Sequence, residues 1–224
     1  MKKPKKSLSQ NFLKDKNICQ KIVNLTEISN KIVVEIGPGY GFMTDFILEK
    51  KPEKLYLVEK DIQLINHLKK KYQKNNKVEI IPYDILKHDF QSYNNLVVVS
   101  NLPYNVSTKI ILYLFKYNLN INTMILMIQR EVAIKFDYNI PGMNRYKFLT
   151  KIISTFKRNF DVSPNVFIPK PKIYSTVVSF KFNNNKVDLD KAISFSNTLF
   201  KNMRKKIYKK LNINNNNNIL LNKR

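Results

Sequence analysis

Residues 32–41 read Ile-Val-Val-Glu-Ile-Gly-Pro-Gly-Tyr-Gly, and this stretch decides the class of fold. Its apolar first half, Ile32–Ile36, predicts a buried strand, and the residues after it, through about Lys50, predict an amphipathic helix. A strand, a glycine-rich turn and a helix open the nucleotide-binding units of α/β folds. Three of the four glycines in the chain lie in this turn, whereas a turn alone needs one. We therefore expect the backbone to approach a ligand closely, and the G-x-G-x-G spacing favours an adenosyl ligand smaller than a dinucleotide.

Further apolar runs alternate with helical patterns along the chain, which is typical of a mostly parallel sheet. We expect further strands at residues 55–58, 78–81, 96–100, 124–128, 158–162 and 175–182. The expected helices include residues 15–28, residues 107–117, residues 145–156 and one that carries a stripe of Ile62, Ile65, Leu68 and Tyr72. No helix separates the last two strands, so we expect an antiparallel pair at the edge of the sheet. The sequence thus predicts an α/β fold around a seven-stranded, mostly parallel sheet.

Acidic side chains follow the second and third expected strands. Glu59 lies about 20 residues beyond the glycine turn, which is where nucleotide-binding units place an acceptor for the ribose hydroxyls. Asp84 follows the third strand at the same edge of the sheet. Its carboxylate is suited to accept a hydrogen bond from an adenine amino group, but aspartate also caps turns for purely local reasons. Spacing alone leaves both interpretations of Asp84 open.

The stretch Ser100-Asn101-Leu102-Pro103-Tyr104 follows the central strand, at the edge where open α/β sheets bind ligands. The Asn101 amide oxygen and a neighbouring main-chain carbonyl are hydrogen-bond acceptors, and Pro103 stiffens the loop. Tyr104 offers a flat face. Together they suit a planar base that bears an amino group, although the same residues also form ordinary strand-to-helix turns. Farther along, Phe167 lies among prolines and is either a core residue or a second aromatic face for the base.

The charge of the chain is unusual, with 40 Lys and Arg against 16 Asp and Glu and a net charge of +24. Such an excess is best tolerated beside a polyanion, so nucleic acid is the expected partner. The chain has no run of about 18 apolar residues and a single cysteine, which favours a cytoplasmic protein without a membrane span. A cluster near the end of the sequence is expected to contact RNA phosphates rather than form a solvated face: Lys201, Arg204, Lys205, Lys206, Lys209 and Lys210.

Taken in order, short motifs resemble the ribosomal RNA adenine dimethyltransferases, and the bacterial enzymes of the small subunit most closely. The motifs are Gln10–Leu13, Glu35–Gly39, Glu59, Asp84, Asn101–Tyr104 and Phe167–Lys172. The match runs from residue 7 to about residue 182, so it is far more specific than a lone Asn-Leu-Pro-Tyr. The resemblance implies a Rossmann-like class I methyltransferase fold. It also implies dimethylation of N6 of two adjacent adenines near the 3′ end of 16S rRNA.

The same resemblance implies S-adenosylmethionine as the methyl donor and assigns residues to its site. Asn11 and Leu13 would line the site beside Gly37 and Gly39 in the glycine turn. Glu59 would then hold the ribose, Asp84 would bind the adenine amino group, and Asn101 would lie between donor and target.

For the target adenine, the resemblance implies that the Asn101 oxygen and the Leu102 carbonyl accept the two protons of the amino group. Tyr104 and Phe167 would sandwich the base after it leaves its stack. A sulfonium methyl group is already electrophilic, so we expect no metal and no covalent nucleophile.

Domain organisation departs from the family pattern. We expect a methyltransferase domain in residues 1–185 and an abbreviated, basic helical segment with an asparagine-rich tail in residues 186–224. The family normally ends in a larger helical domain that helps it dock on the ribosomal subunit. The expected partner is 16S rRNA or the assembling small subunit, bound by a monomer.

The sequence leaves two other functions as alternatives. One is the related 23S rRNA adenine methyltransferase of the macrolide-resistance type, whose loop more often carries Ile where Leu102 stands. The other is a non-catalytic RNA-binding assembly or transcription factor with the same fold. A DNA adenine methyltransferase is disfavoured because those enzymes carry Asp-Pro-Pro-Tyr in this loop.

Overall fold

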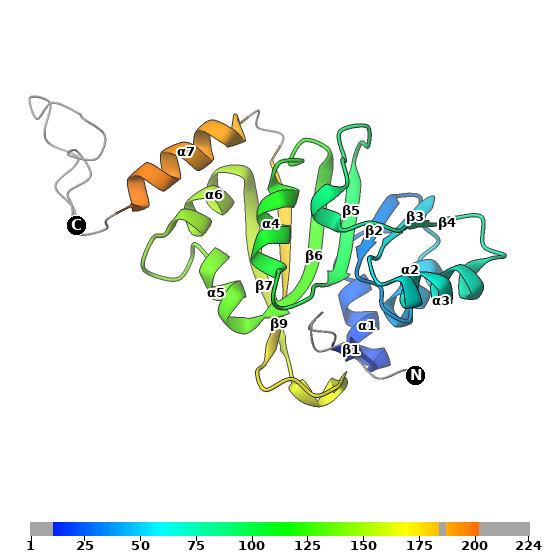
Figure 1. Cartoon of the computed structure of the whole chain (residues 1–224). Coiled ribbons are helices and arrows are strands. Elements are labelled where there is room, and N and C mark those ends of the chain that lie inside the picture. Colours follow the sequence, from blue (N-terminus) through cyan, green and yellow to red (C-terminus); the bar gives the residue numbers. More distant parts are fainter. Residues whose placement is uncertain (1–10, 184–186, 202–224) are drawn as a thin grey trace, which may run out of the picture.

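One large sheet forms the middle layer of the protein, with helices on both of its faces, as Figure 1 shows. This computed structural model describes residues 11–183 and 187–201. The strands of the sheet are β2 Ile32–Ile36, β3 Lys54–Val58, β4 Val78–Ile81, β5 Leu96–Asn101, β6 Ile121–Gln129, β7 Ser154–Val162 and β9 Ser175–Phe182. They lie in the order β4-β3-β2-β5-β6-β9-β7. Among these described strands, β9 pairs antiparallel with both β6 and β7, and the other pairs are parallel, so the predicted seven-stranded, mostly parallel sheet is confirmed.

Helices cover both faces of this sheet (Figure 1). They are α1 Lys16–Val23, α2 Phe42–Glu49, α3 Ile62–Tyr72, α4 Ser107–Phe115, α5 Arg130–Phe136, α6 Arg145–Ile153 and α7 Leu189–Phe200. Among the described residues, the 3₁₀ turns η2 Ile85–Lys87 and η3 Pro164–Val166 lie in the connections. In the described part of the chain, no helix is both long enough and apolar enough to span a membrane.

The two faces of the sheet are separate hydrophobic cores because successive strand residues point to opposite sides. In β2, Val33 packs with the core formed by α1, α2 and α3. Its neighbour Val34 packs with the core formed by α4, α5 and α6. The same alternation repeats in β5, where Val97 and Val98 belong to different cores. Burial on both faces explains why these strands read as continuous apolar runs.

A second, two-stranded sheet connects distant parts of the sequence. Strand β1, Phe12–Leu13, pairs antiparallel with β8, Phe167–Ile168. This pairing brings the stretch before α1 beside the proline-rich segment before β9, at the edge of the large sheet where the parallel strands end.

Some predicted element boundaries are wrong. Helix α1 is capped by Asp15 as its sequence suggests, but it ends at Val23 rather than residue 28. Helix α6 ends at Ile153, because Ser154–Phe156 pair with β9 and so continue as strand β7. Ile62, predicted on the buried stripe of α3, is 62% exposed. It is the first residue of that helix, and the buried face is formed by Leu64, Ile65, Leu68 and Tyr72 instead.

Candidate active site

The site lies where the order of the strands reverses. The chain leaves β2 toward β3 and β4, then returns to place β5 against the other side of β2. The carboxyl ends of β2 and β5 are therefore neighbours, and such a switch point is the usual ligand-binding position in open α/β sheets. The Ser100 hydroxyl donates a hydrogen bond to the Ile36 carbonyl and ties the two ends together.

A cavity opens at this point, and its wall contains most of the predicted site residues. These are Asn11, Leu13, Gly37, Gly39, Glu59, Asn101, Leu102, Pro103 and Tyr104. They come from four separate stretches of the sequence. The structure thus brings together residues that sequence reasoning had assigned to one site.

The glycine turn needs glycine for both conformation and space. Gly37 and Gly39 have φ angles of 65° and 61°, in the left-handed region that side chains disfavour. A Cβ atom at Gly39 would lie 2.8 Å from the Phe12 ring. The turn therefore exposes bare backbone to the cavity, which is what a close ligand contact requires.

Glu59 lines the cavity from the end of β3 and is nearly buried. Its Oε1 atom accepts hydrogen bonds from the main-chain amides of Lys60 and Asp61, both at 2.9 Å. Burial raises the pKa of Glu59, and these amides oppose the shift by favouring the charged form. The carboxylate is held in one orientation at the mouth of the cavity.

Asn101 presents an unpaired acceptor. Its Nδ2 atom donates a hydrogen bond to the Asn11 carbonyl at 3.1 Å, which fixes the orientation of the amide. Its Oδ1 atom is buried and has no hydrogen-bond partner among the residues that the structure describes. An unsatisfied buried acceptor costs about 1–3 kcal/mol, so it is expected where a ligand donor completes it.

Tyr104 is anchored at its hydroxyl end. Its oxygen lies 2.6 Å from the Ser175 hydroxyl oxygen at the start of β9. Burial raises the pKa of Tyr104, and Tyr104 is one of the residues that line the cavity. The Leu102 main-chain amide donates a hydrogen bond to the Met127 carbonyl at 3.1 Å, which attaches the loop to β6 at this residue.

Phe167 does not offer a stacking face, contrary to the sequence prediction. It is only 2% exposed and packs in the core beneath α1, α2 and α3. The physical reason is the pairing of β8 with β1, in which Phe167 is opposite Leu13. Its place as a core residue was the other interpretation that the sequence left open.

Asp84 and Lys201 are not among the residues that line the cavity. Asp84 caps η2 by accepting from the Leu86 amide, and its Oδ2 atom is 3.4 Å from Lys60 Nζ. Since Lys60 lines the cavity, Asp84 stands one residue behind the wall. Lys201 is exposed at the end of α7, and the remaining predicted RNA contacts, Arg204, Lys205, Lys206, Lys209 and Lys210, lie outside the described residues.

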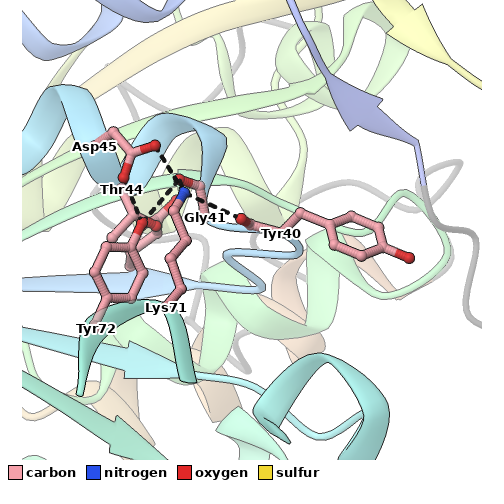
Figure 2. Close-up of polar contacts among 7 residues, drawn as sticks. Tyr40, Gly41, Thr44, Asp45, Lys71 and Tyr72 are labelled. Atoms are coloured by element: carbon pink, nitrogen blue, oxygen red, sulfur yellow. Dashed lines mark hydrogen bonds and ion pairs between the residues drawn. The ribbon is translucent and has the colours of Figure 1, made fainter. Parts of the chain in front are cut away.

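A network that the sequence did not predict holds the glycine turn from the α3 side (Figure 2). Lys71 Nζ lies 2.8 Å from the Gly41 carbonyl oxygen, 3.3 Å from the Tyr40 carbonyl oxygen and 2.7 Å from Asp45 Oδ2. The Tyr72 hydroxyl lies 2.9 Å from the same Gly41 carbonyl and 2.7 Å from Asp45 Oδ1. The Tyr40 ring points away from this network. The side chains of Lys71 and Tyr72, at the end of α3, thus hold the glycine turn in place at the start of α2.

Glu35 is the buried acid behind this network. It lines the cavity, is 2% exposed and accepts a hydrogen bond from the Thr44 hydroxyl at 2.6 Å. Burial raises the pKa of Glu35 to about 8, although the Thr44 hydrogen bond and the Lys71 charge lower it. The sequence placed Glu35 in a motif without giving it a role, because nothing local distinguishes it from a strand residue.

The switch-point cavity, glycine turn and acid after β3 define the class of protein. This is a class I methyltransferase fold, whose members use S-adenosylmethionine. The residues present fit that cofactor: the turn admits no side chain at Gly39, and Glu59 offers a fixed acceptor.

The family follows from comparison with known proteins. The chain belongs to the ribosomal RNA adenine dimethylase family, whose model matches residues 1–223. It is 41% identical over 220 residues to the ribosomal RNA small subunit methyltransferase A of Pelagibacter ubique, covering 93% of this chain and 82% of that relative. The protein is therefore an rRNA adenine dimethyltransferase that uses S-adenosylmethionine, as its motifs predicted.

Solved structures support the fold. A dimethyladenosine transferase from Plasmodium falciparum has a TM-score of 0.79 at 25% identity, over 89% of this chain and 74% of that one. The 23S rRNA methyltransferase ErmE has a TM-score of 0.77 at 22% identity, over 90% of this chain and 83% of that one. The second likeness shows a shared fold only.

Proposed function

We propose that this enzyme dimethylates N6 of two adjacent adenines near the 3′ end of 16S rRNA during assembly of the small ribosomal subunit. The observation that carries the chemistry is the buried, unpaired Oδ1 atom of Asn101 beside the glycine turn. An adenine amino group is a donor that would complete it. The choice of the small subunit is supported by the relative from Pelagibacter ubique, whose name assigns it to small-subunit RNA.

In this proposal Gly37 and Gly39 of the glycine turn would hold the cofactor. Glu59 would accept from the ribose hydroxyls, and Asp84, next to Lys60 of the cavity wall, would accept from the adenine amino group of the cofactor. Asn11 and Leu13 close the site from the N-terminal side, where β1 is held by its pairing with β8. When bound, S-adenosylmethionine supplies an electrophilic methyl group.

Asn101 and Leu102 act on the target amine. Its lone pair is delocalised into the purine ring, which makes the nitrogen a weak nucleophile. Two acceptors, Asn101 Oδ1 and the Leu102 carbonyl, favour a pyramidal nitrogen with a localised lone pair. They are held in place before reaction, so they stabilise the transition state more than the ground state.

The transfer itself needs in-line positioning. The target nitrogen would take up the methyl group that the cofactor supplies and would release one proton to solvent. Tyr104 stacks on the target base, and its hydroxyl contact with Ser175 holds the ring in position. Stacking of about 1–3 kcal/mol offsets part of the cost of taking the adenine out of its stack.

Incubation of the purified enzyme with labelled cofactor and either 16S rRNA, small-subunit particles or 23S rRNA tests the proposal. Methylated positions are mapped by mass spectrometry of nuclease fragments. We expect dimethyladenosine at two adjacent positions near the 3′ end of 16S rRNA, and more in particles than in naked RNA. Label only in 23S rRNA would favour the macrolide-resistance type of activity, and binding without transfer would favour a non-catalytic assembly factor.

The organisation of the whole chain is part of the proposal. We infer that residues 1–185 form the catalytic domain and that residues 186–224 form a short basic segment that contacts rRNA. We also infer a monomer that works in the cytoplasm. Analytical ultracentrifugation with and without RNA would test the oligomeric state, and a dimer in both samples would contradict it.

A further inference from the structure

The loop between β8 and β9, residues 169–174, combines exposed apolar side chains with positive charge. Tyr174 is 52% exposed and Ile173 is 38% exposed. Lys170 and Lys172 are exposed in the same loop, and residues 163–175 contain no Asp or Glu. An exposed aromatic ring beside cations is the usual composition of a surface that binds single-stranded nucleic acid.

This loop lies at the catalytic edge of the sheet. Ser175, the first residue of β9, is opposite Gln129, the last residue of β6. In Figure 1 the yellow chain that precedes β9 projects beyond this end of the sheet. The position of Tyr174 just before Ser175 therefore places it on the side of the sheet where the cavity opens.

Contacts at Tyr174 and at the next residue, Ser175, attach this part of the chain to the active-site edge of the sheet. The Tyr174 carbonyl accepts from the Arg130 amide at 3.1 Å, at the start of α5. The next residue, Ser175, lies within hydrogen-bond distance of the Tyr104 hydroxyl. Two strand spacings separate β9 from β5, the strand that ends at Asn101, which corresponds to about 10 Å. That separation suits a nucleotide next to the one in the cavity.

We propose that loop 169–174 binds the single-stranded RNA beside the target adenine, with Tyr174 stacked on a neighbouring base. Lys170 and Lys172 contact the flanking phosphates. Pro169 and Pro171 restrict the loop, so less conformational entropy is lost when RNA binds. This inference rests on the proposed RNA substrate and assigns it an unpaired form at the site. Because Phe167 is buried, Tyr174 is the aromatic group that this segment offers to RNA.

The stacking contact is tested by binding alone. The probe is a short fluorescent single-stranded RNA with two adjacent adenines, followed by anisotropy without cofactor. We expect Tyr174→Ala to weaken binding about ten-fold and Tyr174→Phe to stay within about two-fold, because a phenyl ring stacks as well. Leu119→Ala is the control, since this exposed side chain lies just before β6, at the opposite end of the sheet.

The phosphate contacts are tested by salt dependence. We expect the double variant Lys170→Gln with Lys172→Gln to lower the slope of log Kd against log salt by about 1.4, or 0.7 for each contact with a single strand. The matched control changes Lys69 and Lys70, which are exposed in the last turn of α3. Its slope should match that of the wild type.

Two results would overturn the inference: RNA binding by Tyr174→Ala equal to that of the wild type, or binding by Tyr174→Phe as weak as by Tyr174→Ala. A wild-type protein that does not bind the probe at all would overturn it too. Unchanged S-adenosylmethionine binding in every variant confirms that the fold is intact. If Tyr174 matters for binding but no methyl group reaches 16S rRNA, the proposed substrate fails while the RNA-binding loop stands.

Discussion

The burial of a single residue, Glu35, makes the free energy of unfolding of the protein depend on pH. The pKa of Glu35 is raised to about 8 because the carboxyl group is buried, whereas an unfolded chain holds glutamate near its ordinary value of about 4.3. Between these values the folded protein binds a proton that the unfolded chain does not. Its contribution to the free energy of unfolding is therefore greatest at low pH and falls as pH rises through this window.

We expect Glu35→Gln to remove this pH-dependent contribution to the free energy of unfolding, since glutamine stays neutral at every pH. Thermal unfolding of the wild type between about pH 5 and 8 should show a fall in Tm that is smaller in the variant. Glu53→Gln, which changes an exposed acid, serves as the control. Parallel curves for the wild type and Glu35→Gln would contradict the raised pKa.

Residue positions at strand ends were predictable, and residues fixed by distant pairing were not. Glu59 and Asn101 follow apolar runs, and parallel strands bring their carboxyl ends to one edge, so the sequence places them correctly. The orientation of Phe167 depends on the pairing of β8 with β1, a contact between opposite ends of the described chain. No local pattern distinguishes that core position from an exposed aromatic.

Helices and strands have the bounds that the apolar pattern of the sequence predicts where the local conformational preference and the tertiary packing agree. Strand β2 has the predicted bounds because its apolar run ends at the glycine turn. The end of α6 was missed, because pairing with β9 overrides the helical pattern of Ser154–Phe156. Tyr72 fits the apolar stripe of α3, but its sequence position gives no sign that its hydroxyl contacts the glycine turn.

The contact between α3 and the glycine turn leads to a prediction for cofactor binding. Tyr72→Phe keeps the buried ring but loses the hydroxyl contacts to Gly41 and Asp45. A hydrogen bond contributes about 1 kcal/mol, so we expect S-adenosylmethionine to bind about five-fold more weakly. Lys71→Met should act in the same direction, and titration calorimetry measures both.

Lys70→Met is the matched control because Lys70 is an exposed neighbour on the same helix. The KM for RNA should not change in any of these variants, since the network touches the cofactor turn and not loop 169–174. Cofactor affinity equal to the wild type in both Tyr72→Phe and Lys71→Met would show that the turn holds its shape without α3.

At the scale of the whole molecule, the excess of 24 positive charges makes RNA binding sensitive to salt. Lys201 is exposed at the end of α7, and the basic residues that follow it continue the cluster. We expect reversal of several charges among Lys201, Arg204, Lys205, Lys206, Lys209 and Lys210 to weaken rRNA binding and flatten its salt dependence.

Filter binding over a range of salt concentrations measures this slope, with reversal of Lys69 and Lys70 as the control. A slope unchanged by reversal in the 201–210 cluster would show that it is only a solvated face. In that case the contacts with rRNA would come from the catalytic domain, including loop 169–174.

Methyl transfer in this enzyme depends most on the acceptor that Asn101 directs at the target amine. The direct test measures S-adenosylmethionine affinity and the single-turnover rate of methyl transfer on the same preparations of wild type and Asn101→Ala. We expect the rate to fall about a hundred-fold, as for loss of other preorganised hydrogen-bonding groups in active sites, while cofactor affinity changes no more than a few-fold. An equal loss of binding and transfer, or transfer at the wild-type rate, would contradict the role of Asn101.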